Sequence, residues 1–356
     1  MRVALIGPPQ SGKSVLFAAV AEAGGSHVHI SRPDQPHLAV VKVPDERLDW
    51  LAELHHPRKV TPAELEFLDL PGFDLSSEAG RTHARTHWAT MEQSNMLVFV
   101  VAGFADPTVP AYRGKANPAR DVDELKQEML FADLERVAAR IDRIEKAMEK
   151  PAGRHDEHRH ELELMKRLRD TLEDEKPISD EIKTESESRL VRSFQFLTLK
   201  PTLAVLNCTE DQAGESGPGE LSGVPVIQLS ARIEEELAQL APEDRGEFLQ
   251  DLGLTEGARD RLIRACYERL NLVSFLTDGP DECRAWTVPA GTKAVEAAEE
   301  IHSDIARGFI RAETVAFDDL RAAGDHKQAK TAGKVRLEGK EYVVRDGDVI
   351  YFRFNV

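Results

Sequence analysis

The segment GPPQSGKS, residues 7–14, combines glycines, a lysine and a serine at the spacing G-x-x-x-x-G-K-S. An apolar run that predicts a strand precedes it and one that predicts a helix follows it, the context in which this spacing binds phosphate. Backbone N–H groups can surround a phosphate there, and the helix dipole favours negative charge. We expect Gly12 to permit close approach, Lys13 to reach phosphate oxygens and Ser14 to ligate Mg²⁺. The residues predicted to contact a nucleoside triphosphate are Gln10, Ser11, Gly12, Lys13, Ser14 and Val15.

A second motif, FLDLPGF, ends another apolar run. Asp69 stands where a strand should end, which suits a carboxylate that holds Mg²⁺ through its water shell, and Gly72 can offer an N–H to a γ-phosphate. The alternative is an ordinary strand that ends in a turn, but the phosphate loop upstream favours the metal site. We therefore expect Lys13, Asp69 and Gly72 to act in catalysis, and Ser14 and Asp69 to hold the metal.

A third run, VLNCTED, places Asn207 and Glu210 after another predicted strand. Guanine-specific proteins of this architecture have Asn-Lys-x-Asp there, and the aspartate accepts two hydrogen bonds from guanine. Glutamate is one methylene longer and Cys208 lacks the lysine stem, so guanine loses bonds worth about 1–3 kcal/mol each. Adenine needs no carboxylate, and we expect the Asn207 amide to meet its N6 and N7 positions. Ser230 and Ala231, after the next strand, could add a backbone N–H, so we predict ATP-preferring or relaxed binding.

The strands that must position these residues are visible as short apolar runs between helical stretches. Several runs are apolar on both faces, which is typical of strands covered by helices on each side. The pattern predicts an α/β fold. The runs are VALIG (3–7), LAVVKV (38–43), LEFLDL (65–70), NMLVFVVAGF (95–104), PTLAVLN (201–207) and VPVIQLS (224–230).

From about Ala119 to Arg192 charged residues predominate and apolar residues recur at helical spacing. A break at Pro151 and Gly153 predicts an antiparallel helical hairpin inserted into the sheet domain. The hairpin is either a solvated arm that closes a loop or an arm that binds a partner. Its two apolar stripes are Leu130, Leu134, Val137, Ile141, Ile144 and Met148, and Leu162, Met165, Leu168 and Leu172.

After about Phe275 the pattern returns to strands and turns. The closing segment, KVRLEGKEYVVRDGDVIYFRFNV, alternates apolar and polar residues around two glycine turns, which predicts hairpin strands. Residues 283–356 carry twelve basic and twelve acidic side chains, so the remainder of the chain carries the whole net charge of −17. This neutral module either contacts RNA or is merely charge-balanced. The basic residues available for RNA are Arg284, Arg307, Arg311, Lys334 and Arg336.

Composition narrows the class of protein. The 356 residues, 41% of them hydrophobic, can bury a core in two or three domains. A pI near 5.2 argues against binding nucleic acid through the overall field, so no DNA partner is expected. Three cysteines are too few for a disulfide framework. With neither an apparent signal peptide nor an apolar stretch of membrane-spanning length, we expect a cytoplasmic protein without a membrane partner.

Together these residues resemble the YchF family, the Obg-like ATPases, over almost the whole chain. The resemblance is carried by the phosphate loop, VPDERLDWLAEL, ELEFLDLPG, FLTLKP, NCTE, SARIEEELAQL and the stretch from FLTDGPDECRAWTV to the end. It implies a P-loop NTPase G domain in two parts (1–118 and 193–274), an α-helical coiled-coil insertion (119–192) and a C-terminal ubiquitin-like, β-grasp TGS domain (275–356). It also implies hydrolysis of ATP, and often GTP, with Mg²⁺, and association with the ribosome or ribosomal RNA.

The first departure from the family pattern concerns switch I. The family carries a threonine there that ligates Mg²⁺, but this chain has no threonine between Val15 and Val60. Pro33 occupies the corresponding position, and Ser31 or Asp34 could substitute.

The second departure is in switch II, where DLPGFDLSSEAGRTHARTHW lacks the family's glycine pattern. Phe73 stands where classical GTPases place a water-orienting glutamine, so unassisted turnover should be slow, about 10⁻⁴ to 10⁻² per second. His83 and His87, four apart on one face of a predicted helix, would take a surface role or help to position water rather than bind a metal.

The favoured function is slow, Mg²⁺-dependent hydrolysis of ATP, with GTP tolerated, coupled to the ribosome. The main alternative is an adaptor protein that binds nucleotide without hydrolysing it, which the altered switches would explain. A small-molecule kinase is disfavoured, because it would have no use for DLPG, NCTE or the terminal module.

Overall fold

The computed structural model describes residues 1–23, 34–106, 108–149, 155–215, 217–241 and 243–355. The chain forms two compact units. The P-loop unit comprises Met1–Ala39 and Glu66–Ala258, and the β-grasp unit comprises Val40–Leu65 and Arg259–Val356. Residues 40–65 therefore pack with the C-terminal segment, although they are distant from it in the sequence.

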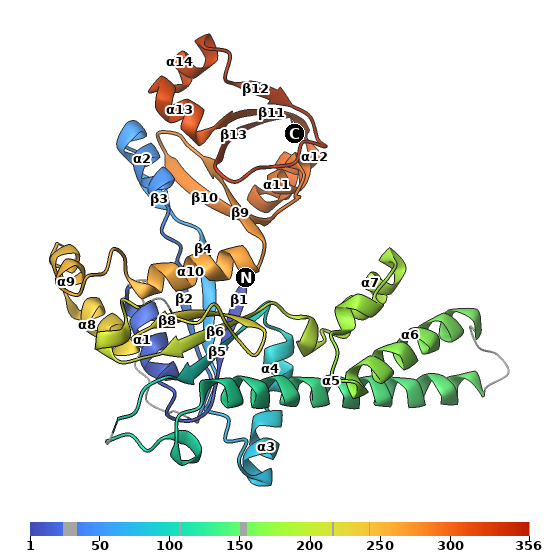
Figure 1. The fold of residues 1–356 in the computed structure, drawn as a ribbon. Helices are drawn as coiled ribbons and strands as arrows, with labels where there is room; N and C mark the ends of the chain where they lie inside the picture. The colour runs from blue at the N-terminus through green and yellow to red at the C-terminus, as the bar shows by residue number, and fades with distance from the viewer. Residues whose placement is uncertain (24–33, 107, 150–154, 216, 242, 356) are drawn as a thin grey trace. The chain divides into compact units, whose positions relative to one another are not determined.

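The P-loop unit is built on a seven-stranded sheet (Figure 1). Across the sheet the strands are β2 (His37–Lys42), β4 (Glu64–Asp69), β1 (Arg2–Ile6), β5 (Met96–Ala102), β6 (Thr202–Asn207), β8 (Val224–Leu229) and β7 (Glu220–Leu221). The run β4, β1, β5, β6 and β8 is parallel, and β7 is antiparallel to β8. All six predicted apolar runs form strands, and the α/β P-loop fold class is confirmed.

Helices cover both faces because side chains alternate along each strand. Ile6 and Phe99 pack with Met129 of α5 (Pro118–Met148) and Met91 of α4 (Trp88–Glu92) in one buried cluster. Elsewhere in the unit α1 (Lys13–Ala23) packs against α8 (Ala231–Gln239), and α9 (Arg245–Asp251) follows. Helix α10 (Ala258–Arg269) belongs, apart from Ala258, to the β-grasp unit. Burial of each such large side chain stabilises the fold by about 1.5–3 kcal/mol.

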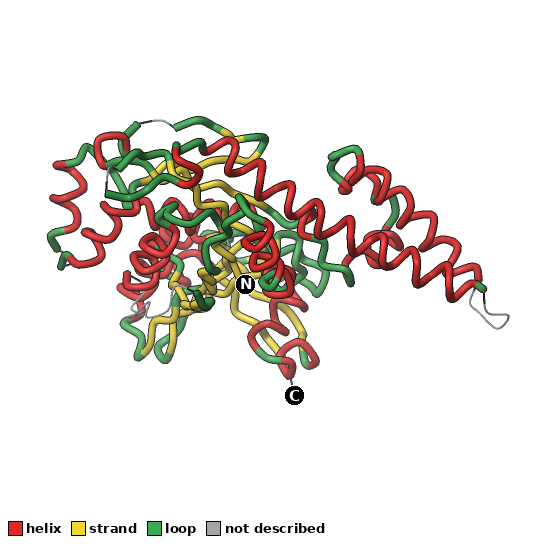
Figure 2. Tube along the Cα trace, turned by 90° about the horizontal axis from the view of Figure 1, so that it is seen from below, coloured by secondary structure: helices red, strands yellow, loops and turns green. Residues whose placement is uncertain are grey.

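The predicted helical hairpin consists of α5 and α6 (His155–Glu173), followed by α7 (Glu185–Arg192). Figures 1 and 2 show α5 and α6 side by side. Helix α5 starts at Pro118 because the Asn117 side chain caps it, accepting a hydrogen bond from Arg120 N at 3.2 Å. Both predicted apolar stripes lie in one core cluster that holds the two helices together.

The β-grasp unit contains a six-stranded sheet. In order, its strands are β12 (Arg336–Glu338), β11 (Phe309–Ala316), β13 (Asp348–Phe354), β9 (Leu272–Thr277), β10 (Glu282–Pro289) and β3 (Lys59–Thr61). Its helices are α2 (Glu46–His55), α11 (Ala294–Ile301), α12 (Ser303–Arg307), α13 (Phe317–Ala323) and α14 (His326–Thr331). The central strands β9 and β13 are parallel, and α11 packs through Ala297 and Ala298 onto a cluster that includes Phe275.

Two local predictions are wrong. The closing segment does not form a hairpin, because β12 and β13 both pair with β11, which lies between them. Nor do His83 and His87 share a helix. Helix α3 (Glu78–Arg85) ends where the Thr86 hydroxyl donates to the His83 carbonyl at 2.6 Å, and His87 lies at the N-cap position of the separate helix α4 without a side-chain capping bond.

Within the described ranges, no helix combines the length and apolar character needed to cross a membrane. The three cysteines, Cys208, Cys266 and Cys283, are buried free thiols.

Candidate functional site

The phosphate loop connects β1 to α1, and its glycines are dictated by close packing. Gly12 has φ of +83°, and a Cβ there would lie 2.0 Å from Nδ2 of Asn207. A Cβ on Gly7 would lie 2.2 Å from the carbonyl oxygen of Val100. Gln10 also adopts a positive φ, of 63°. The loop is therefore pressed against the ends of β5 and β6, where only glycine fits.

Lys13 and Ser14 of the loop meet Asp69 at the end of β4. The Lys13 ammonium is 5% exposed and donates to the Asp69 carboxylate and to the Leu70 carbonyl oxygen. The Ser14 hydroxyl donates to Oδ2 of Asp69 at 2.8 Å. Burial lowers the pKa of Lys13, while Asp69 opposes that shift by favouring the ammonium form. The structure thus joins the two motifs that the sequence singled out.

The donor atoms at this point fit Mg²⁺. Ser14 and Asp69 offer a hydroxyl and a carboxylate oxygen within 2.8 Å of each other, and Mg²⁺ binds oxygen ligands, commonly one or two from the protein with phosphate and water completing its shell. The hydroxyl of Ser11 is buried without a hydrogen-bond partner among the described residues. Of the proposed switch I substitutes, Asp34 is exposed, whereas Ser31, like Pro33, lies outside the described residues.

Gly72 and Phe73 follow Asp69 and lie against the phosphate loop. The Phe73 N–H donates to the Gly7 carbonyl at 2.9 Å, and a Cβ on Gly72 would be 3.0 Å from Cα of Pro9. Phe73 is buried, and its ring stacks on His87 with centroids 6.1 Å apart. The aromatic pair therefore lies next to the loop.

The sequence analysis put His87 on one helix with His83 and did not predict its contact with Phe73. Its Nε2 is buried and has no hydrogen-bond partner among the described residues. Desolvation, together with the charges of His83 and Lys13, lowers the pKa of His87, so its imidazole is neutral at pH 7. The ring lies near the phosphate loop because it stacks on Phe73, whose N–H donates to the Gly7 carbonyl. The sequence feature that could have indicated this position is Phe73, on which His87 stacks.

A cavity of about 670 Å³ opens beside the phosphate loop and is large enough for a purine nucleoside. Its wall includes Gln10, Gly12, Val15, Asn207, Cys208, Glu210, Ser230 and Ala231. The structure thereby brings together the predicted base residues and part of the predicted phosphate loop.

The Asn207 amide has a different task from the one expected. Its Nδ2 donates to the carbonyl of Ser11 at 3.0 Å, and its Oδ1 accepts from the N–H of Ala231 at 2.9 Å. Asn207 is 5% exposed, so in this conformation it ties the phosphate loop to the start of α8. The N–H of Ala231 is likewise engaged by Asn207, and the expected contacts of both groups to adenine do not follow from this geometry.

Glu210 and Cys208 line the cavity in different ways. Glu210 pairs with Arg232 at 3.0 Å, and both side chains are largely exposed. The Cys208 thiol is buried, with Sγ 3.3 Å from the Leu229 carbonyl. A carboxylate that is already paired with arginine offers guanine a weaker anchor.

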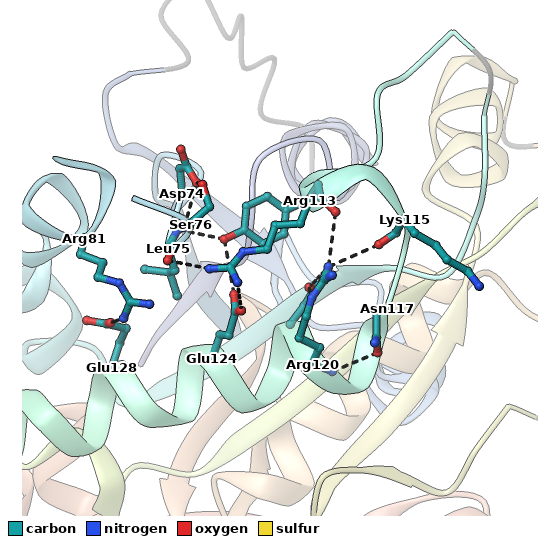
Figure 3. A network of polar contacts seen from close by, with 12 residues as sticks. Asp74, Leu75, Ser76, Arg81, Arg113, Lys115, Asn117, Arg120, Glu124 and Glu128 are labelled. Atoms are coloured by element: carbon teal, nitrogen blue, oxygen red, sulfur yellow. Dashed lines mark hydrogen bonds and ion pairs between the residues drawn. The ribbon is translucent and has the colours of Figure 1, made fainter. Parts of the chain in front are cut away.

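The segment after Phe73 is fastened to the start of the helical hairpin (Figure 3). The N–H of Leu75 donates to the Tyr112 hydroxyl at 2.9 Å, and its carbonyl accepts from Arg113 at 2.8 Å. Arg113 pairs with Glu124 of α5 at 2.7 Å, and Arg81 pairs with Glu128 one turn further. Sequence spacing gave no signal for this network, because its members lie in three separate segments.

The Asn207 bridge makes a direct prediction. Asn207→Ala leaves the Ser11 carbonyl and the Ala231 N–H unpaired, which should lower the free energy of unfolding by about 1–3 kcal/mol for each group. Because the phosphate loop loses its brace, nucleotide affinity should fall as well. Urea unfolding and nucleotide titration measure the two effects. Thr209→Ala, on the same cavity wall, is the control, and equal stability of both variants would contradict the bridge.

Comparison with known proteins agrees with this geometry. The family model YchF-GTPase_C, described as a protein of unknown function (DUF933), matches residues 272–355. The chain is 39% identical to the ribosome-binding ATPase YchF of Bacillus subtilis (strain 168), covering 99% of this chain and 98% of that protein. It is 31% identical to Obg-like ATPase 1 of Oryza sativa subsp. japonica, covering 100% and 92%.

Solved structures show the same fold. The Schizosaccharomyces pombe YchF GTPase superposes with a TM-score of 0.84 at 25% identity, covering 99% of this chain and 97% of that one. A GTP-binding protein from Pyrococcus horikoshii OT3 gives a TM-score of 0.61 at 16% identity over the whole of both chains, which concerns the fold alone. The chain aligns with these relatives over nearly its full length and has the phosphate loop described above. It therefore belongs to the YchF family of P-loop nucleotide hydrolases.

Proposed function

We propose that this protein binds Mg·ATP in the phosphate loop and the adjoining cavity and hydrolyses it slowly, with GTP tolerated, in association with the ribosome. The observation that carries the proposal is the meeting of Lys13 and Ser14, at the start of α1, with Asp69, at the end of β4. Relatives named ribosome-binding ATPase, aligned over nearly the full length, support the activity and the partner.

The catalytic contribution of the chain is positioning and electrostatics. Lys13 and the loop N–H groups from Gln10 to Val15 would neutralise charge on the phosphates, and Gly72 would donate its N–H to the γ-phosphate. Ser14 and Asp69 would hold Mg²⁺, which would supply positive charge to offset that of the phosphates. Lys13 must leave Asp69 to reach the phosphates, so binding would release the carboxylate toward the metal.

His87 would position the attacking water, since the buried Phe73 cannot. The neutral imidazole next to Phe73 presents a nitrogen without a partner among the described residues, which can accept a hydrogen bond from water.

Base selection would rest on the absence of an unpaired carboxylate that could accept hydrogen bonds from guanine. Because Glu210 pairs with Arg232, the carboxylate gives guanine little, and adenine needs none. The proposal therefore keeps ATP as the preferred substrate, although Asn207 acts as a brace.

Ribosome contact would use the helical hairpin. A groove of about 490 Å³ beside α5 is lined by Arg136, Arg140, Arg143 and Phe194 among others. Arg136 and Arg140 pair with Glu92 and Glu161, whereas Arg143 is exposed at the groove. Cations with an aromatic ring fit single-stranded RNA, whose phosphates and bases they can bind.

In the C-terminal module the expected RNA residues are mostly engaged within the chain. Arg284 lies over the Trp286 ring, Arg307 pairs with Asp304, and Lys334 pairs with Asp319 at 2.9 Å. Arg336 pairs with Glu338 at 3.5 Å. These contacts favour the hairpin over the module as the first surface to test.

Single-turnover cleavage of labelled ATP, with and without ribosomes, tests the activity. Wild type should bind ATP more tightly than GTP in competition and cleave it slowly, and Lys13→Ala should lose at least about 100-fold in cleavage, since one oxyanion-type contact is worth that much. The alternative of a non-hydrolysing adaptor predicts saturable binding without cleavage under either condition. Absence of any saturable ATP or GTP binding would exclude both.

His87→Ala should lower the cleavage rate at least about tenfold without changing ATP affinity, because the residue would act on water alone. Since the pKa of His87 is lowered from 6.5, the wild-type rate should fall as the pH drops, with a midpoint below pH 6.5, because the imidazole gains its proton there. The variant should lack that fall. His160→Ala, at an exposed histidine of α6, is the control. If the His87→Ala enzyme cleaves ATP at the normal rate, His87 has only a packing role.

Arg143→Glu should weaken co-sedimentation with ribosomes and reduce its dependence on salt, because a phosphate contact releases counterions. Arg189→Glu on α7, which makes the same change of charge at an exposed site, is the matched control. If both variants sediment like wild type, the groove is not the contact surface.

A further inference from the structure

Three side chains with metal-binding chemistry meet inside the β-grasp unit: His55, Asp278 and His326. Nε2 of His55 and Nε2 of His326 each lie 2.7 Å from the same atom, Oδ2 of Asp278. One ligand atom from each residue lies within 4.8 Å of the other two. Two imidazole nitrogens and a carboxylate oxygen therefore converge on one point.

The backbone around these residues is fixed by packing. His55 is the last residue of α2, Asp278 directly follows β9, and His326 is the first residue of α14. Leu51 of α2, Leu276 of β9 and Ala329 of α14 belong to one buried cluster. The cluster fixes three segments that are far apart in the sequence. The three side chains are thereby preorganised, as a metal site requires.

Hydrogen bonding does not satisfy the cluster. His326 Nε2 forms a hydrogen bond with Oδ2 of Asp278, whereas His55 Nε2 is buried and has no hydrogen bond of acceptable geometry among the described residues, although it is 2.7 Å from that oxygen. The Asp278 oxygen therefore has one imidazole hydrogen-bonded to it and a second imidazole nitrogen at the same distance.

We propose that His55, Asp278 and His326 bind a divalent transition-metal ion, with Zn²⁺ as the best fit. Zn²⁺ commonly takes two imidazoles and a carboxylate, whereas Mg²⁺ and Ca²⁺ prefer oxygen ligands. The ligand atoms would move apart from 2.7 Å to about 3.3 Å to suit tetrahedral bonds of about 2.0 Å. The side chains of His55 and His326 are 26% and 41% exposed, which leaves a fourth position for water.

Such an ion would hold residues 40–65 to the C-terminal segment of the β-grasp unit. Its role is therefore in the stability of that unit, and it is separate from the magnesium at the phosphate loop. Because only the folded chain presents all three ligands, binding should raise the melting temperature.

The test uses the full-length protein, stripped of metal with a chelator and kept in excess Mg²⁺ so that the phosphate loop does not take the probe. Co²⁺ should bind with one equivalent and give the visible absorption of a tetrahedral ion, and Zn²⁺ should displace it. Zn²⁺ alone should raise the melting temperature. Neither result is expected if the three side chains form only a hydrogen-bonded cluster.

His326→Gln and Asp278→Asn should each weaken Co²⁺ binding at least about 100-fold. Removal of a ligand should reduce the affinity at least as much as removal of a group that hydrogen-bonds to a ligand. His160→Gln, at an exposed histidine of α6, should bind like wild type. Wild-type protein that binds no Co²⁺, or a His326→Gln protein that binds it as tightly as wild type, would overturn the proposal. Loss of binding in His160→Gln alone would place the ion elsewhere and would overturn it equally. Should one variant fail to fold, the other and the wild-type spectrum decide.

Discussion

The buried ammonium of Lys13 requires a negative partner, and Asp69 supplies it. A charge removed from water is tolerated only when it is paired and hydrogen-bonded, and Lys13 is 5% exposed. This requirement brings the start of α1 and the end of β4 to one point at the carboxyl edge of the parallel sheet. Anything anionic that attracts Lys13 competes with Asp69 for it. The loop and the segment after β4 are therefore coupled through this ion pair and through the hydrogen bonds of Ser14 and Phe73.

That coupling extends to the helical hairpin by direct contacts. Phe73 N–H is bonded to the phosphate loop, and Leu75 is held on both its N–H and its carbonyl by the residues that precede α5. Arg113 and Arg81 then pair with acidic residues on α5 itself. A change in the segment after Asp69 must break or carry these contacts, so the hairpin has a physical link to the phosphate site. The link consists of hydrogen bonds and ion pairs between neighbouring groups.

In the cavity beside the loop, Asn207 joins two elements of the wall by hydrogen bonds. The Asn207 amide forms hydrogen bonds with Ser11 and Ala231, which fixes the distance between the loop and α8. The cavity keeps its shape because a buried amide with two unmet bonds would be costly. At the rim of the cavity Glu210 and Arg232 form an ion pair. In the β-grasp unit, by contrast, Nε2 of His55 is buried without a hydrogen bond among the described residues, and a bound cation would satisfy it.

The amino-acid sequence by itself determined the six main strands of the P-loop unit, the two apolar stripes of the hairpin and the phosphate loop, because each depends on spacing between near neighbours. Strand alternation, helical periodicity and the G-x-x-x-x-G-K-S spacing are local properties. Only the tertiary structure decided that Asn207 is a brace, that β11 separates β12 from β13, that His83 and His87 lie on different helices, and that residues 40–65 join the C-terminal segment. It also decided that His55, Asp278 and His326 meet. Each of these depends on which distant segments share a core or a hydrogen bond, and spacing along the chain carries no record of that.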